Sequence, residues 1–292
     1  AQAMGAKASC ADCDGQEGCC RNGSAVSGVV VLKTEGGRLA DSDAPESKEP
    51  RVARPEYTFA SGIRYTGEWV GKHRDGQGVQ VWEDGGKYCG QFVKGLASGH
   101  GKFQQANGDI YEGAWKDDKA NGHGIYVKKD GAVYEGQWLD DKEHGQGREK
   151  WPDGGSYVGQ YKLGNKSGEG KISWPGGSAY EGQFQFNDID GAGEYVWGDG
   201  RVFKGQWAKN QMHGKGICTW PDGRSYDGEY TYDKKDGYGV FTWPDGSHYA
   251  GSWKDGKQHG TGIYKLPGAE EKAGEWVNGR RVRAAEASKN ED

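Results

Sequence analysis

Residues 111–124 read Tyr-Glu-Gly-Ala-Trp-Lys-Asp-Asp-Lys-Ala-Asn-Gly-His-Gly, and variants of this stretch recur along most of the chain at a spacing of 23 residues. A fixed period of this length indicates an array of tandem repeats rather than one globular core. We therefore expect function to be a property of the surfaces that the repeats present. The ten repeats begin at Tyr65, Tyr88, Tyr111, Tyr134, Tyr157, Tyr180, Phe203, Tyr226, Tyr249 and Lys272.

Each repeat has the pattern of a β-hairpin. Tyr, Gly and Trp at alternate positions, as in Tyr111, Gly113 and Trp115, predict a strand with one aromatic face. We expect a loop of about six polar residues next, and then a second strand that starts near two glycines such as Gly122 and Gly124. The turn sequence Trp-Pro-Asp-Gly, as at residues 151–154, predicts a three-residue loop that reverses the chain.

The sequence therefore predicts an all-β fold, an elongated single-layer twisted antiparallel sheet of about ten tandem hairpins. Glycine inside a strand costs about 0.5–1 kcal/mol, so we interpret the repeated strand glycines as room for a neighbouring ring to lie on the backbone. The aromatic face is predicted to comprise Tyr65, Trp69, Trp82, Tyr111, Trp115, Tyr134, Trp138, Trp151, Trp174, Trp197, Trp207, Trp220, Trp243, Trp253 and Trp276. These rings either pack on one another or leave a groove for a partner.

Composition excludes several classes of protein. The chain has 12 Trp and 16 Tyr in 292 residues, which argues against disorder across the array. The net charge is -5, and acidic and basic residues are mixed, so we expect no nucleic-acid partner. No stretch of about 20 apolar residues is present to form a membrane-spanning helix.

The stretch Tyr-Glu-Gly-x-Trp followed by Gly-x-Gly, at residues 111–124 and 134–147, closely resembles the MORN repeat. The resemblance covers about residues 57–279 and implies an elongated antiparallel sheet. It also implies a scaffold at membranes, division rings, cilia or cytoskeletal junctions, with phospholipid binding or self-association as a homodimer in some members. The kinase and methyltransferase domains that some relatives carry have no counterpart here, so we expect no enzyme, no cofactor and no catalytic residue.

The amino-terminal segment carries a possible lipidation signal. Residues 4–9, Met-Gly-Ala-Lys-Ala-Ser, fit the N-myristoylation pattern, and we expect the native chain to start at Met4. One myristoyl chain binds membranes only marginally, so a second acyl group is required. The predicted lipidation residues are Gly5, Cys10, Cys13, Cys19 and Cys20. Zinc binding and incidental thiols are the alternatives for these cysteines.

The domain organisation follows from these patterns. Residues 1–32 are predicted to be a disordered Cys-rich acylation segment, 33–56 a flexible linker, 57–279 the array with a half-repeat cap at 57–64, and 280–292 a tail. Six histidines, including His144 and His213, recur near the expected inter-strand loop. Equivalent residues of adjacent repeats should lie about 10 Å apart, so we expect no metal site.

We interpret the chain as a non-enzymatic scaffold, tethered by acyl chains to the cytoplasmic face of a membrane or the cell cortex, that presents its sheet to protein partners. The first alternative is a soluble structural component of a cilium, axoneme or other cytoskeletal structure. The second is a module that binds anionic phospholipid through the array itself, although its neutral-to-acidic charge argues against that role.

Overall fold

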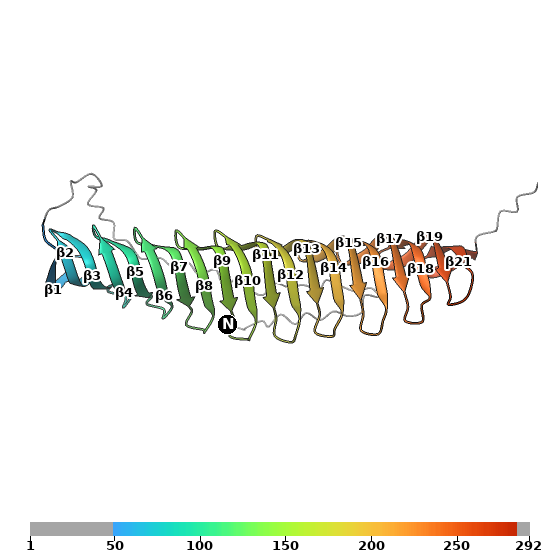
Figure 1. Cartoon of the computed structure of the whole chain (residues 1–292), viewed down its shortest axis with the longest axis horizontal. Coiled ribbons are helices and arrows are strands. Elements are labelled where there is room, and N and C mark those ends of the chain that lie inside the picture. The colour runs from blue at the N-terminus through green and yellow to red at the C-terminus, as the bar shows by residue number, and fades with distance from the viewer. Residues whose placement is uncertain (1–48, 285–292) are drawn as a thin grey trace, which may run out of the picture. The chain divides into compact units, whose positions relative to one another are not determined.

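The computed structural model describes residues 49–284, which form two compact bodies. The amino-terminal body comprises the described residues up to 165, and the carboxyl-terminal body comprises residues 166–284. No helix occurs among the described residues, and in each body consecutive strands pair antiparallel as one open sheet (Figure 1). The prediction of an all-β array of tandem antiparallel hairpins is confirmed.

Strands of about seven and nine residues alternate along the chain. The amino-terminal body contains β1 (Val52–Thr58), β2 (Arg64–Val70), β3 (His73–Val81), β4 (Lys87–Val93), β5 (Leu96–Gln104), β6 (Ile110–Lys116), β7 (Lys119–Val127), β8 (Val133–Leu139), β9 (Lys142–Lys150) and β10 (Ser156–Lys162).

The carboxyl-terminal body continues the same alternation and ends on a short strand. It contains β11 (Asn165–Ser173), β12 (Ala179–Gln185), β13 (Asp188–Val196), β14 (Val202–Ala208), β15 (Gln211–Thr219), β16 (Ser225–Thr231), β17 (Lys234–Thr242), β18 (His248–Lys254), β19 (Lys257–Lys265), β20 (Lys272–Val277) and β21 (Arg280–Ala284). The first residue of β11, Asn165, is counted with the amino-terminal body.

The connection inside each hairpin differs from the expected six-residue loop. β6 and β7 are joined by only two residues, Asp117 and Asp118, whose φ angles are 51° and 66°. Positive φ at both positions defines a type I′ turn, whose twist matches that of the flanking strands. The prediction of a six-residue loop was therefore wrong, because the polar residues after the two-residue turn belong to the second strand. The histidines at positions 73, 100, 123, 144, 213 and 259 likewise lie in strands.

The connection between hairpins is the three-residue loop that the Pro-Asp-Gly sequence predicts. The Trp151 N–H donates to the Gly155 carbonyl at 2.9 Å, and the Gly154 N–H donates to the Trp151 carbonyl at 3.0 Å. Gly154 has a φ of 92°, which the absence of a side chain permits, and the Asp153 carboxylate accepts the Gly155 N–H at 2.9 Å.

Each hairpin contains a β-bulge, which the sequence analysis did not anticipate. In the β4–β5 pair, Gly90 faces Gly101 and Phe92 faces Ala97, so three residues of β5 oppose one of β4. The Gln91 side chain fills the gap and accepts the His100 N–H at 2.8 Å. Gln137 does the same for Gln146 at 2.9 Å. The Glu or Gln after the strand glycine is thus an internal acceptor.

The core is a layer of rings on one face of the sheet. We call this the ring face, which in β6 carries Tyr111, Gly113 and Trp115, and we call the opposite one the outer face, which carries Glu112 and Ala114. Tyr111 is fully buried; a side chain at Gly124 would overlap its ring, and one at Gly113 would meet its hydroxyl group and the Gly124 backbone. The glycines therefore provide the space that the ring occupies, as expected.

The second residue of each type I′ turn hydrogen-bonds to the repeat before it, through its N–H alone where it is Gly, as at Gly95, and also through its side chain where it is Asp or Asn. The Asp118 N–H donates to the Ala97 carbonyl at 3.0 Å, while its carboxylate accepts the Ala97 N–H at 2.7 Å. Asn210 makes the same pair of hydrogen bonds to Ile189, at 2.9 and 2.7 Å. An Asp or Asn at the second turn position therefore satisfies both backbone groups of a residue 21 positions earlier.

The ends of the described chain extend the sheet beyond the assigned boundaries. β1 includes residues 52–56, which the sequence analysis assigns to the linker, and it pairs with β2 through a bulge between Arg54 and Tyr57. β21 takes up residues 280–284 of the assigned tail and pairs with β20. The boundaries differ because neither segment carries the aromatic alternation that marked the other strands.

We expect Gly101→Ala to destabilise the amino-terminal body by about 1–3 kcal/mol, because the added methyl group would overlap the Tyr88 ring and overpack the core. The denaturant midpoint measures this loss. Gly95→Asn is the matched control, since Gly95 lies in a type I′ turn, nothing lies near its missing side chain, and Asn tolerates positive φ. Equal loss in both variants would contradict the role assigned to Gly101.

We expect Asp141→Asn to stabilise the protein at pH 7, by about 1 kcal/mol after allowance for partial exposure, and to have little effect near pH 3.5. Burial raises the pKa of Asp141 to about 6, although the Ala120 N–H and Lys119 oppose this. A carboxyl group whose pKa is higher in the folded state costs stability as the pH rises from about 4 to about 6. Asparagine keeps the acceptor and does not ionise.

The free energy of unfolding from pH 3.5 to 7.5 measures this difference between the variant and the wild type. Asp140→Asn is the comparison, because Asp140 is exposed in the same turn and its charge is a lesser cause of the raised Asp141 pKa, so it should give a smaller gain over the same pH range. A gain at Asp141 that does not change with pH would show that ionisation plays no part in it.

Candidate functional site

The ring face is the most extensive ordered feature that the repeats build. Tyr111 meets Trp115 of its own repeat edge to face, with ring centroids 5.1 Å apart and an interplanar angle of 89°. It meets Trp138 of the next repeat in the same way, at 5.1 Å and 81°. Edge-to-face pairs contribute about 0.5–1.5 kcal/mol each beyond burial, so the rings form a ladder that couples neighbouring repeats.

The predicted aromatic residues fall into two groups by burial. The tyrosines and the tryptophans of the first strands are buried, namely Tyr65, Trp69, Tyr111, Trp115, Tyr134, Trp138, Trp207, Trp253 and Trp276. The tryptophans that end the second strands are half-buried except for Trp197, which is buried; the others are Trp82, Trp151, Trp174, Trp220 and Trp243. The second group therefore forms the more accessible part of the ring face.

The tyrosine hydroxyls on the ring face are structural donors. The Tyr111 hydroxyl donates to the Ala114 carbonyl at 2.9 Å, and the Tyr249 hydroxyl donates to the Ser252 carbonyl at 3.0 Å. Burial raises the pKa of Tyr65 and of Tyr249 to about 12 and raises that of Tyr111 further. These phenols therefore stay protonated near neutral pH and do not supply a phenolate nucleophile.

Charged residues lie on the ring face where the sequence analysis placed only rings. Lys235, near the start of β17, is buried, and its ammonium group lies 4.7–5.3 Å from the centroids of four rings. Those rings are Trp220, Tyr226, Phe241 and Trp253. Attraction between a cation and aromatic faces offsets part of the cost of burying the charge.

Arg74 occupies the equivalent position in β3, seven repeats earlier. Its guanidinium lies 5.3 Å from the Phe92 ring centroid, and it donates to the Gly95 carbonyl at 2.5 Å and to the Gln80 side chain. The 23-residue register could have identified these positions, because Ala97, Ala120, Ile189 and Met212 occupy the same place in other repeats and are buried.

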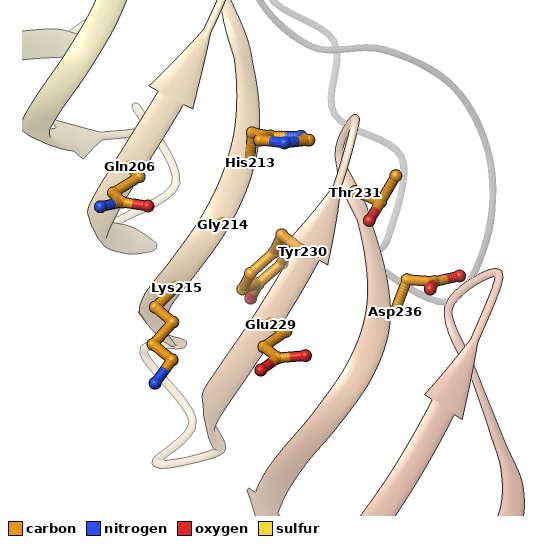
Figure 2. A pocket seen from close by; sticks show the side chains of 8 residues that line it. All are labelled: Gln206, His213, Gly214, Lys215, Glu229, Tyr230, Thr231 and Asp236. Atoms are coloured by element: carbon orange, nitrogen blue, oxygen red, sulfur yellow. The ribbon is translucent and has the colours of Figure 1, made fainter.

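A polar hollow of about 520 Å³ lies in the carboxyl-terminal body. Gln206, His213, Gly214, Lys215, Glu229, Tyr230, Thr231 and Asp236 line it (Figure 2). Lys215 and Glu229 are direct cross-strand neighbours on β15 and β16, and the His213 ring lies 4.9 Å from that of Tyr232. Lys215 and Thr231 are exposed, so the hollow is open to solvent and does not enclose a small molecule.

The structure does not bring the histidines together as a metal site. Residues 49–284 contain no group of three or more His, Cys, Asp or Glu side chains that could hold a metal ion. Cys89 is exposed and Cys218 is buried. The predicted lipidation residues Gly5, Cys10, Cys13, Cys19 and Cys20 lie outside the described part of the chain.

The part of the chain that the structure describes contains no helix with the length and apolar character needed to cross a membrane.

Solved structures with a detectable likeness are distant. The TCP domain of Drosophila melanogaster SAS-4 (dCPAP), in complex with a proline-rich motif of Ana2 (dSTIL), has 17% sequence identity and a TM-score of 0.32 over 65% of this chain and 95% of that one. The TCP10 domain of Danio rerio CPAP has 12% identity and a TM-score of 0.26 over 80% and 100%. Likeness at this level carries no argument about function. No curated protein sequence matches the chain.

The repeats themselves match a known sequence family along most of the array. The MORN repeat matches residues 65–87, 88–110, 111–133, 134–156, 157–179, 180–200, 203–223, 226–248, 249–268 and 273–282. These matches start within one residue of the repeat starts that the 23-residue period gave. The chain therefore belongs to the MORN-repeat family.

Proposed function

We propose that this protein is a scaffold that is held at the cytoplasmic face of a membrane by amino-terminal acyl chains and presents its sheet to protein partners at a cortical or cytoskeletal structure. MORN repeats suggest a scaffold or a protein-binding or membrane-binding role, and the repeat is a non-catalytic unit. The proposal adds the anchor, the location and the protein partners to that role.

The observation that supports the scaffold role is that packing between repeats buries the tyrosine rings of the ring face. The tyrosines of the ring face are fully buried against glycines and neighbouring rings, so this layer maintains the repeat array. The outer face, by contrast, carries exposed side chains on every strand of the repeats, such as Glu112 on β6 and Ile125 on β7. A sheet with one face buried by ring packing and one face exposed to solvent suits the docking of partners rather than the enclosure of a substrate.

The anchor rests on residues 4–20 of the sequence. Gly5 follows Met4 in a myristoylation pattern, and Cys10, Cys13, Cys19 and Cys20 offer sites for the second acyl group that stable binding needs. The nearest of these cysteines lies five residues from Gly5, so both lipids would enter the same patch of membrane.

We expect a chain that starts at Met4 to be recovered with membranes after cell fractionation, and Gly5→Ala to move most of it to the supernatant. Replacement of the four cysteines by serine should give an intermediate loss, because one myristoyl chain binds only marginally. Incorporation of an alkyne-labelled myristate tests the modification directly, and Ala6→Gly is the control for a change beside the acceptor.

Equal membrane recovery of the wild type and Gly5→Ala would refute the anchor. Retention of both in detergent-extracted cytoskeletons would instead favour a structural component of a cilium or axoneme. Vesicle binding that survives removal of residues 1–48 would favour phospholipid recognition by the array.

A further inference from the structure

The outer face of the carboxyl-terminal body changes character along its length. One row of cross-strand neighbours runs from Lys171 to Ala273, one residue from each strand. Its first part is charged and paired: Lys171 lies 3.0 Å from Glu181, and Lys204 lies 3.8 Å from Glu194. Its last part is apolar.

The apolar part occupies four neighbouring strands. Val240 on β17 faces Ala250 on β18, Ala250 faces Ile263 on β19, and Ile263 faces Ala273 on β20. Ile263 is 38% exposed, Ala273 is exposed, and Val240 and Ala250 are half-buried. Alternation of large and small side chains gives this row one shallow recess, at Ala250 between Val240 and Ile263, and a low end at Ala273.

Basic residues border the row on the side of the type I′ turns. Lys254 and Lys257 face each other across the end of the β18–β19 hairpin, and Arg280 faces Val277 across the end of β20–β21. The neighbours of Lys254 and Val277 on the ring face, Trp253 and Trp276, are buried, so these side chains lie on the outer face.

Two carboxylates near the basic border reduce its charge without cancelling it. Asp255 lies in the turn between Lys254 and Lys257, where its carboxylate is 2.9 Å from the Lys234 ammonium. Glu275 lies on β20 of the same face. A third carboxylate, Asp227 on β16, faces Val240 at the far end of the row. The three border cations and Lys234 therefore stand against three anions, and the cations lie at the end of the row that carries Ala250, Ile263 and Ala273. The border favours an acidic partner.

We infer that this row, which we call the apolar row (Val240, Ala250, Ile263 and Ala273), docks an acidic amphipathic helix of a partner protein. The row crosses three strand spacings of about 4.8 Å, or about 14 Å, which matches an apolar helical stripe at i, i+4, i+7 and i+11. Acidic residues beside that stripe would face Lys254, Lys257 and Arg280. The inference rests on the proposed scaffold function and gives it a docking surface.

Charge argues against a second copy of the chain as the occupant. If two apolar rows met antiparallel in a symmetric dimer, the basic borders would approach each other, and like charges across an interface are unfavourable. The other body lacks such a row, because Lys102 pairs with Glu112 at 3.3 Å and Arg148 pairs with Glu135 at 2.6 Å. Between those pairs Ile125 stands alone, at the position equivalent to Ile263 six repeats earlier.

The test uses the full chain and two synthetic helical peptides that share one leucine stripe at i, i+4, i+7 and i+11. One peptide has glutamates beside the stripe, and the other has lysines. We expect the glutamate peptide to bind more tightly and to shift the backbone amide NMR signals of Val240, Ala250, Ile263 and Ala273. Ile263→Glu should weaken its binding by about tenfold or more, as expected for a central contact.

Ile125→Glu is the matched control, because Ile125 is 40% exposed at the equivalent position and should leave binding unchanged. Lys257→Glu should weaken the glutamate peptide and favour the lysine peptide, whereas Lys119→Glu, its equivalent in the other body, should do neither. Ile263, Ile125 and Lys257 are exposed, so their variants should keep the wild-type thermal midpoint. Lys119 lies 3.9 Å from Asp140, so Lys119→Glu is compared at a temperature where circular dichroism shows it fully folded.

Equal binding of the two peptides, or equal loss with Ile263→Glu and Ile125→Glu, would overturn the inference. So would a dimer in sedimentation that Ile263→Glu disperses, since the row would then bind a second copy. Loss of binding to phosphatidylserine vesicles with Ile263→Glu would assign the row to a membrane instead. None of these results depends on Gly5, so failure here leaves the fractionation test of the scaffold intact.

Discussion

The structure depends on an aromatic ring that lies across two paired glycines and touches the next repeat. Tyr111 covers the backbone of Gly113 and Gly124, donates its hydroxyl to the Ala114 carbonyl, and meets rings of two successive repeats edge to face. A side chain at Gly124 would take the space of the ring, and one at Gly113 would meet the Tyr111 hydroxyl and the backbone of the paired strand. Glycine weakens a strand, yet here it permits the burial of a large side chain. Each repeat is therefore stabilised partly by its successor.

The fold was predictable where the signal was local. The 23-residue period, the alternation of Tyr, Gly and Trp, and the Pro-Asp-Gly turns predicted the hairpins and the faces of their first strands. The structure of the segment after Trp115 was not predicted correctly, because Asp118 and the residues after it have the amino-acid composition of a loop. The N–H and the carboxylate of Asp118 bond to Ala97, which is 21 residues earlier, and a local pattern does not reveal such a contact. Polar composition alone does not distinguish a loop from a strand whose polar side chains hydrogen-bond to a neighbouring repeat.

The sequence predicted only part of the candidate surfaces. The rings of the aromatic face were found from spacing, and the first-strand members are buried as a ladder. Lys235 was missed because its charge suggested a solvated position, whereas four rings surround its ammonium group. The apolar row was missed because Val240, Ala250, Ile263 and Ala273 are far apart in sequence, and only the strand register places them side by side. Ring packing thus occupies one face and leaves the outer face exposed.

Hydrogen exchange of individual strands in wild type and Tyr111→Leu tests most directly whether rings couple successive repeats. The account predicts that amides of β6 and β7 lose protection, and that amides of β8, whose Trp138 contacts Tyr111, lose protection to a similar degree. Glu112→Leu, on the outer face of the same strand, should leave β8 unchanged. Loss confined to β6 and β7 in the Tyr111 variant would contradict the account, because each repeat would then be stable without the ring of its neighbour.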